Sequence, residues 1–587
     1  VAAGGCSRQE ASAQATSPAE RGILPESIFS DGPSVLEGYV ADEAICARCH
    51  QEIAETMVTM GMGRGFTVPS LETNVEDFSD AMYHHERSGL HYQMETDSDG
   101  NIWMNQFQVA PDGRPIHALR QQAQYAVGSG NHARSYLYHT PGGELFELPL
   151  SWYHHDGHGF WAMSPGYDTA HHSRTTRPIT RECLFCHNAY PDVVAGSDGF
   201  GDPHRFPERL PMGLGCQRCH GPAQAHVDLA YSAEASDSEI ADSILNPDDL
   251  PQPLQVDLCM QCHLQGSSRL ASLVRRFGRD DFSYQPGEPL EEYLVHIDYA
   301  FDPSTEEFEI NHHGLRMQQS ACWIESDGAM TCTTCHDPHR KMPAGDRLAF
   351  HRGRCLTCHE VDQCGIESMS PDHPMTGTSS DDCVACHMPA RRSQDAIHGV
   401  VTDHFIRRSP PVEDFLAQID GDGPPPPGAV AMLHDPTLTD RTPTARLYPL
   451  VADANNGRSD VLDELSRLLR ETPVAAPDPY MALAGGLMNA GRMEEAVGVF
   501  DGVIHAFPEL ASPRVNKAIL LNSLGDPDAA ITQLREAIDQ DPYLPEAHYD
   551  LATLLLAQSS VQEGLSHLYT ALELRPHYVE ALRLLGN

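Results

Sequence analysis

The sequence predicts a mainly α protein that is built in two parts. The run Cys-x-x-Cys-His occurs seven times between residues 46 and 387 and then stops. Beyond a proline block, Pro508, Pro542 and Pro576 define a 34-residue period, which is typical of stacked helix pairs. The interval 51–182 instead carries short alternating apolar segments between turn signals. We therefore expect a motif-rich domain of short helices with a few β-hairpins, followed by an α-solenoid.

Each Cys-x-x-Cys-His run carries the groups that attach a haem of the c type. Its two thiols add to the vinyl groups of the porphyrin, and the adjacent histidine coordinates the iron. Zinc sites and disulfide frameworks are the alternatives, but neither needs a histidine directly after every second cysteine. We therefore expect seven haem c groups in a haem-packed domain. The expected attachment cysteines are Cys46, Cys49, Cys183, Cys186, Cys216, Cys219, Cys259, Cys262, Cys332, Cys335, Cys355, Cys358, Cys383 and Cys386, and the expected iron ligands are His50, His187, His220, His263, His336, His359 and His387.

Further histidines follow three of the motifs at short range. In "TCTTCHDPHRK", His339 comes three residues after His336, too close to fold back onto the opposite face of the same haem. It can reach the iron of a neighbouring haem, so that one segment would serve two haems. Haem iron with a histidine on each face is low-spin and has no open position for a substrate. The other candidate second ligands are His226 after the third motif, His398 and His404 after the seventh, and His84, His132 and His172 (or its neighbour His171), the last three each weighed against a surface histidine.

Two resemblances follow from these residues. The runs CHGPAQAH and CHMP with distant histidines resemble the multihaem cytochromes related to hydroxylamine oxidoreductase and its tetrahaem electron acceptor, in which such histidines are second ligands. The 34-residue period, with Ala496, Ala530 and Gly564 where helices would cross, resembles the tetratricopeptide repeat. The whole chain is similar to bacterial multihaem cytochromes with a C-terminal array of such repeats. Met62 stands where that family often has a second histidine ligand, and it either binds iron, leaves the site open or packs against a porphyrin.

The composition predicts four regions. Residues 1–40 form an exported tether, 41–408 the seven-haem domain, 409–440 a Pro-rich linker and 441–587 the repeat domain. Attachment of haem c occurs outside the cytoplasm, so we expect a periplasmic or cell-surface protein. Cys6 would then be either the lipid-anchored residue of a lipoprotein or part of an ordinary exported chain, and Cys322 and Cys364 could form a disulfide. No apolar run approaches the roughly 20 residues of a membrane span.

The charge of the chain restricts its partners. Acidic residues outnumber basic ones by 83 to 39, which gives a net charge of −44. Such a field repels nucleic acid and attracts cations or basic proteins, although it also serves plain solubility. We expect an electron carrier with no catalytic residues, whose repeats dock a redox partner or another protomer, as in a polymeric wire, or cap the haem domain. The alternative is an oxidoreductase that acts on a small nitrogen or sulfur compound at one open haem.

Overall fold

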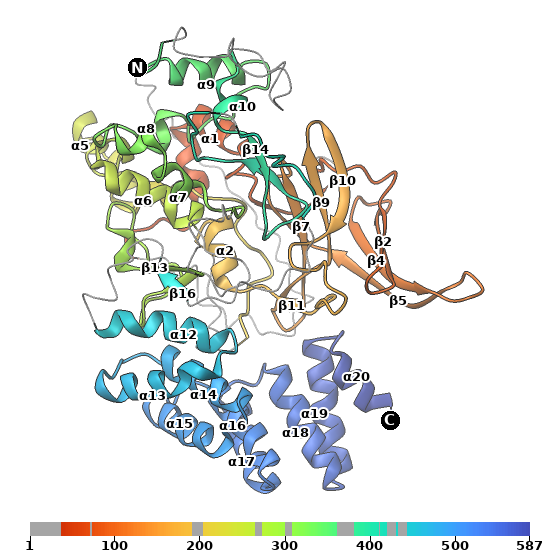
Figure 1. Cartoon of the computed structure of the whole chain (residues 1–587). Coiled ribbons are helices and arrows are strands. Elements are labelled where there is room, and N and C mark those ends of the chain that lie inside the picture. The colour runs from red at the N-terminus through yellow and green to blue at the C-terminus, as the bar shows by residue number, and fades with distance from the viewer. Residues whose placement is uncertain are drawn as a thin grey trace.

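The computed structural model describes residues 37–70, 73–190, 203–264, 273–299, 308–360, 381–409, 411–419, 430–432 and 443–586. Figure 1 shows a layer of C-terminal helices along one side of a mixed region that carries the seven motifs, here called the motif domain (the described residues of 41–408). Cys6 and Cys364 lie outside the described residues, and with them the expected lipid anchor and disulfide. No helix in the described ranges is both long and apolar enough to cross a membrane.

The first half of the motif domain contains more β-structure than the sequence predicted. An antiparallel meander has the strand order β2-β3-β4-β5, and a second sheet has the order β1-β6-β7-β8-β11, with β9 paired to β7 and β10 to β9. The expectation of a mainly α domain with a few hairpins is therefore wrong for this half. The strands are β1 (Phe66–Thr67), β2 (Met82–His85), β3 (Leu90–Thr96), β4 (Ile102–Val109), β5 (Pro115–Ala123), β6 (Tyr125–Val127), β7 (Ala133–His139), β8 (Leu145–Glu147), β9 (Leu150–His155), β10 (His158–Met163) and β11 (Arg177–Pro178).

The two sheets share one apolar core. Strand β3 buries Leu90, Tyr92 and Met94 and leaves the residues between them partly exposed, as expected for a strand with one face in the core. These side chains pack with Tyr136 of β7 and Trp152 of β9, which belong to the other sheet. The β-structure therefore forms a packed unit beside the motif-bearing helices.

The motif-bearing segments are short helices joined by loops, as the sequence predicted. The α-helices of the motif domain, with or without a motif, are α1 (Gln51–Met57), α2 (Arg181–His187), α3 (Gln217–His220), α4 (Gln224–Ala230), α5 (Asp237–Ala241), α6 (Gln252–His263), α7 (His313–Gln318), α8 (Ala321–Ile324), α9 (Arg347–Cys355) and α10 (Cys383–His387). Two motifs contain 3-10 turns, at Glu43–Arg48 and Cys332–Thr334. Small sheets lie between them. Their strands are β12 (Leu273–Arg275), β13 (Leu294–Tyr299) and β16 (Val430–Met432), in that order, and β14 (Ala390–Arg392) with β15 (Val400–Thr402).

The C-terminal helices stack in antiparallel pairs with the predicted 34-residue period. Small residues lie where the helices cross: Ala496 and Ala530 are fully buried, and an added Cβ at Gly564 would meet Leu556 Cγ at 2.8 Å. One further helix pair precedes the repeats. The helices are α12 (Leu447–Asn455), α13 (Leu462–Glu471), α14 (Asp478–Asn489), α15 (Met493–Ala506), α16 (Ser512–Ser523), α17 (Pro527–Gln540), α18 (Pro545–Ala557), α19 (Val561–Leu574) and α20 (Val579–Gly586).

Buried polar contacts fix the helical array to the motif domain. Arg205 Nη1 donates to both carboxylate oxygens of Asp541, at 2.9 and 2.7 Å, and both side chains are buried. At the far end of the array, Arg575 forms an ion pair with Glu144, and the amide of Gly142 donates to the carbonyl of Leu574 at 2.9 Å. The repeats are therefore a docked layer rather than a separate arm.

The motif domain also contacts the first helix of the array. The ring of Tyr448 on α12 stacks on Phe277 at 4.1 Å, and its hydroxyl accepts from the Phe277 amide. Part of the predicted linker also belongs to this region, because Val430–Met432 forms β16 and pairs with β13. These three residues of the predicted linker are therefore held against β13.

Asp541→Asn is expected to loosen the docked array. The substitution keeps the shape of the side chain but leaves Arg205 buried without its counter-charge, which costs about 3 kcal/mol. Hydrogen exchange should accelerate in the peptides around residues 205 and 541 of the full chain. Asp539→Asn, which changes an exposed carboxylate on the neighbouring helix α17, is the control. Equal exchange in the two variants would show that the ion pair does not hold the layers together.

Candidate functional site

Each motif whose backbone contacts are described folds as one tight turn. In the first motif, the amides of Cys49 and His50 both donate to the carbonyl of Cys46, at 3.2 and 2.9 Å. The same histidine-to-cysteine bond, at 3.0 Å, closes the turns that end at His220, His336 and His359. The turn brings two thiols and one imidazole together within five residues. This local arrangement is what covalent attachment and coordination of one haem requires.

Three motif histidines face a second histidine from a distant segment. The pairs are His50 with His226 at 6.3 Å between ring centroids, His220 with His339 at 6.0 Å and His336 with His404 at 6.2 Å. Two imidazoles on opposite faces of one iron would have ring centres about 6 Å apart, because each metal–nitrogen bond is about 2 Å and the ring centre lies about 1 Å beyond the nitrogen. The side chains at these positions therefore fit a haem iron held from both sides.

Backbone carbonyls orient several of these rings. The Nδ1–H of His226 donates to the carbonyl of Ile240 at 2.9 Å, and that of His404 donates to Thr402 at 3.0 Å. The motif histidines His220 and His387 make the corresponding contacts, to the carbonyls of Leu245 at 2.9 Å and Arg407 at 2.7 Å. A proton held on Nδ1 leaves the Nε2 lone pair for a metal, which is the usual outer contact of a ligating histidine.

Burial favours the neutral form of four of the paired imidazoles. It lowers the pKa of His336 to about 4, with His404 and His351 adding to the effect. Burial likewise lowers the pKa of His50, His339 and His404. Because a metal binds only the deprotonated ring, these surroundings favour coordination at neutral pH.

Thiols from different motifs also lie in contact. The pairs are Cys46 with Cys216, Cys186 with Cys262, Cys259 with Cys332 and Cys355 with Cys383. The first pair joins the same two motifs as the His50–His226 pair. Taken with the histidine pairs, these contacts connect all seven motifs, each of which lies in the described part of the chain, into one set.

A buried arginine fills the space between the second and third motifs. Arg218, inside the third motif, is 1% exposed, and its Nη2 donates to the carbonyl of Phe185 in the second motif at 2.7 Å. Its guanidinium lies 4.2 Å from the Phe185 ring centroid and 4.9 Å from that of Tyr190. Stacking on aromatic faces offsets part of the cost of burying this charge.

The structure gives two of the expected second ligands other partners. His398 Nε2 lies 2.8 Å from Asp168 Oδ1. Both ring nitrogens of His172 are engaged, because Nδ1 accepts from the Arg174 amide at 3.1 Å and Nε2 lies 3.2 Å from the Tyr92 hydroxyl. These contacts place His398 against the segment between β10 and β11 and His172 against β3, and the role of either histidine as an iron ligand stays a prediction.

The three remaining candidate iron ligands, His84, His132 and Met62, lie in separate parts of the motif domain. His84 is exposed on β2 and stacks on His91 at 4.2 Å, whereas His132 lies near the pair His154 and His155. Met62 is half-buried, and its carbonyl accepts from Leu214 at the approach to the third motif.

Two histidines that the sequence did not single out, His313 and His351, face motif histidines, and His351 on α9 lies 5.8 Å from His336. His313, at the start of α7, lies 5.6 Å from His263, with the ring planes at 79°. Its separation fits the same two-sided coordination as the other pairs. His313 follows no motif at short range, so its position in the sequence carries no signal.

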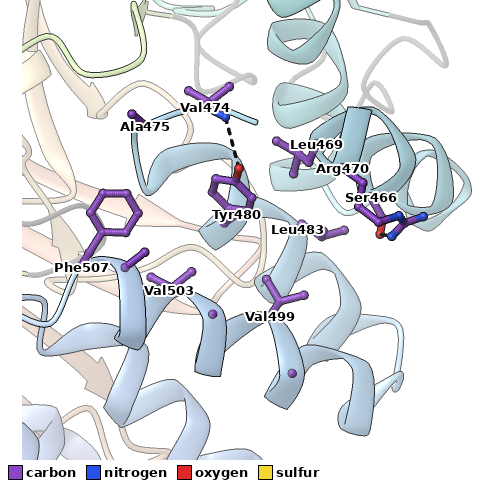
Figure 2. A pocket seen from close by; sticks show the side chains of 13 residues that line it. Ser466, Leu469, Arg470, Val474, Ala475, Tyr480, Leu483, Val499, Val503 and Phe507 are labelled. Carbon is purple, nitrogen blue, oxygen red and sulfur yellow. Dashed lines mark hydrogen bonds between the residues drawn. The ribbon is translucent and has the colours of Figure 1, made fainter. Parts of the chain in front are cut away.

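A second candidate site is an apolar cavity in the helical array. Its volume is about 530 Å³, and its lining residues come from α13, α14, α15 and the segment between α13 and α14. Figure 2 shows the side chains that surround it. Leu469, Val499 and Phe507 supply apolar walls, and Tyr480 is fixed by the Val474 amide, which donates to its hydroxyl at 3.2 Å. The small residues Gly498 and Gly502 on α15 also line it.

The family comparison identifies the C-terminal region. A family model described as the tetratricopeptide repeat matches residues 481–545 and 515–579. The helices within residues 481–579 are tetratricopeptide repeats. This confirms the repeat prediction, and repeats of this kind commonly bind other proteins.

Several known proteins are similar to this chain. A TPR repeat-containing thioredoxin, TTL4 of Arabidopsis thaliana, is 29% identical over 119 residues, which cover 20% of this chain and 17% of that protein. The solved structure of MamA from Desulfovibrio magneticus RS-1 is 17% identical, with a TM-score of 0.22, over 24% of this chain and 79% of that one. A thermophilic TPR protein of Thermus thermophilus is 22% identical, with a TM-score of 0.21, over 24% and 78%.

Gly502→Ala is expected to raise the free energy of unfolding by about 0.5–1 kcal/mol. Glycine inside a helix is less favourable than alanine by that amount, and nothing lies within 4 Å of the added Cβ. Gly564→Ala, the matched change at a helix crossing, should instead destabilise the array because of the contact with Leu556. Denaturant unfolding of the full chain measures both. Destabilisation by Gly502→Ala would show that this cavity wall requires glycine for packing.

Proposed function

We propose that this chain is a multihaem c-type cytochrome that conducts electrons through haems held mostly by two histidines each. The observation that carries the proposal is the connected set of seven motifs, in which three motif histidines face a second histidine at 6.0–6.3 Å. A haem iron with both faces occupied exchanges single electrons without binding a substrate. The connected motifs would form a continuous path for such exchange.

The residues of the chain would orient and insulate this path. The carbonyls of Leu245, Ile240 and Thr402 would hold the ligand rings in place through their Nδ1–H groups. Arg218 would place a fixed positive charge between the second and third haems, where it would favour the more negatively charged, reduced state. His359 of the sixth motif is exposed, which would put one end of the path at the protein surface.

The repeats support a second part of the proposal, the docking of a protein partner or of another protomer. One edge of the array is already engaged by the motif domain through Asp541 and Arg575, so the array also caps that domain. The net charge of −44 favours basic or cationic partners and opposes nucleic acid. Because c-type attachment takes place outside the cytoplasm, we place the protein in the periplasm or at the cell surface.

Electron paramagnetic resonance of the oxidised protein tests the proposal. The chain would be exported by a host that attaches haem c, and its haem content measured. We expect seven covalent haems per chain with low-spin signals that do not change when cyanide or nitrite is added. Absence of covalent haem would contradict the proposal. A high-spin signal that shifts on ligand addition would favour the alternative function, an oxidoreductase acting on a small nitrogen or sulfur compound at an open haem.

His339→Gly provides a sharper test of one ligand pair. Removal of this ring would leave the haem of His220 with one open face, so about one seventh of the iron should become high-spin. Added imidazole should occupy the vacated position and restore the low-spin signal. His158→Gly, which removes an exposed histidine at the start of β10, is the control and should change neither signal. A low-spin spectrum in His339→Gly would show that His339 is not a ligand.

A further inference from the structure

A compact group of one histidine and two carboxylates lies outside the histidine pairs. Asp298 comes from β13, and Glu309 and His312 come from the turn that precedes α7. The side chains of Asp298 and His312 are each 1% exposed, and that of Glu309 is 11% exposed. One ligand atom of each residue lies within 4.8 Å of those of the other two.

The distances within this group match those between the ligands of one metal ion. His312 Nε2 lies 3.3 Å from Asp298 Oδ2 and 3.4 Å from Glu309 Oε2. A charge-assisted N–H···O hydrogen bond is shorter, at about 2.7–2.9 Å. Donor atoms around a tetrahedral ion with bonds of about 2.0 Å are separated by about 3.3 Å. The two distances from His312 Nε2 therefore match the edges of a coordination tetrahedron, and the two carboxylate oxygens lie within 4.8 Å of each other.

The charges of the two carboxylates also favour a bound cation. Two carboxylates that share a buried site repel each other, and removing them from water is costly unless a cation compensates them. A divalent ion would neutralise both at once.

Backbone hydrogen bonds and the Asp395 carboxylate hold the segments that carry the group. Glu309 and His312 are three residues apart in a turn closed by the bond from the His312 amide to the Glu309 carbonyl, at 3.3 Å. The amide of Ile310 donates to Asp395 at 3.0 Å, and β13 is paired on both sides, by β12 and β16. His296 lies two residues before Asp298 and so on the same face of β13.

We propose that Asp298, Glu309 and His312 bind a divalent transition metal, with zinc as the best match. Imidazole combined with carboxylates suits zinc, whereas calcium and magnesium prefer sites made of oxygen atoms alone. The ion would clamp β13 to the turn before α7. Since His313 directly follows His312 and faces His263, the clamp would also position the His313 ring.

Equilibrium dialysis of the full-length protein against Zn²⁺, after treatment with a chelator, tests this site. Zinc is counted by elemental analysis, separately from iron. We expect one tightly bound zinc per chain, and at least about tenfold weaker binding in Asp298→Asn and Glu309→Gln. Zinc should also raise the melting temperature of the wild-type protein but not that of the two variants.

Asp453→Asn is the matched control. Asp453 is a buried carboxylate on α12, paired with Arg458 at 3.1 Å and remote in sequence from the group. Its substitution should leave zinc binding unchanged. A wild-type protein that binds no zinc would overturn the proposal, as would equal binding in wild type and Asp298→Asn. The covalent haem content, measured on the same samples, reports on the proposed electron-transfer function independently of this result.

Discussion

The facing histidines impose the constraint on which the motif domain depends. The ring opposite His50 comes from the segment after the third motif, and the ring opposite His220 comes from the segment after the fifth. Neither of these two motifs therefore completes its surroundings alone. Each is faced by a segment that is far away in the sequence, which helps to explain why the motifs form one connected set instead of independent sites.

This constraint accounts for the weak regular structure of the motif domain. Helix α3 has four residues and α10 has five, too few for such helices to be stable on their own. Contacts between motifs take the place of long helices, as in the burial of Arg218 against Phe185. The repeats add a second, regular layer, and the Arg205–Asp541 pair joins residues that lie 336 positions apart.

The second histidine of a pair could be predicted from the sequence where it follows a motif along the chain. His226, His339 and His404 all follow a motif, and the structure places each of them opposite a motif histidine. His398 also follows a motif, but the β-structure supplies Asp168 as its partner. His313 has no motif before it at short range and only tertiary structure brings it to His263. The β content was underestimated because strands such as β7 and β9 pair across intervening segments.

The sequence by itself determined the motif turns and the 34-residue helical repeats. Both depend on contacts between residues close together in the chain, such as the amide of His50 with the carbonyl of Cys46. Only the tertiary structure decided which histidines face each other, how the repeats dock and where Asp298 meets His312. These contacts join distant segments, and their geometry depends on how whole elements pack, which no local spacing of residues encodes.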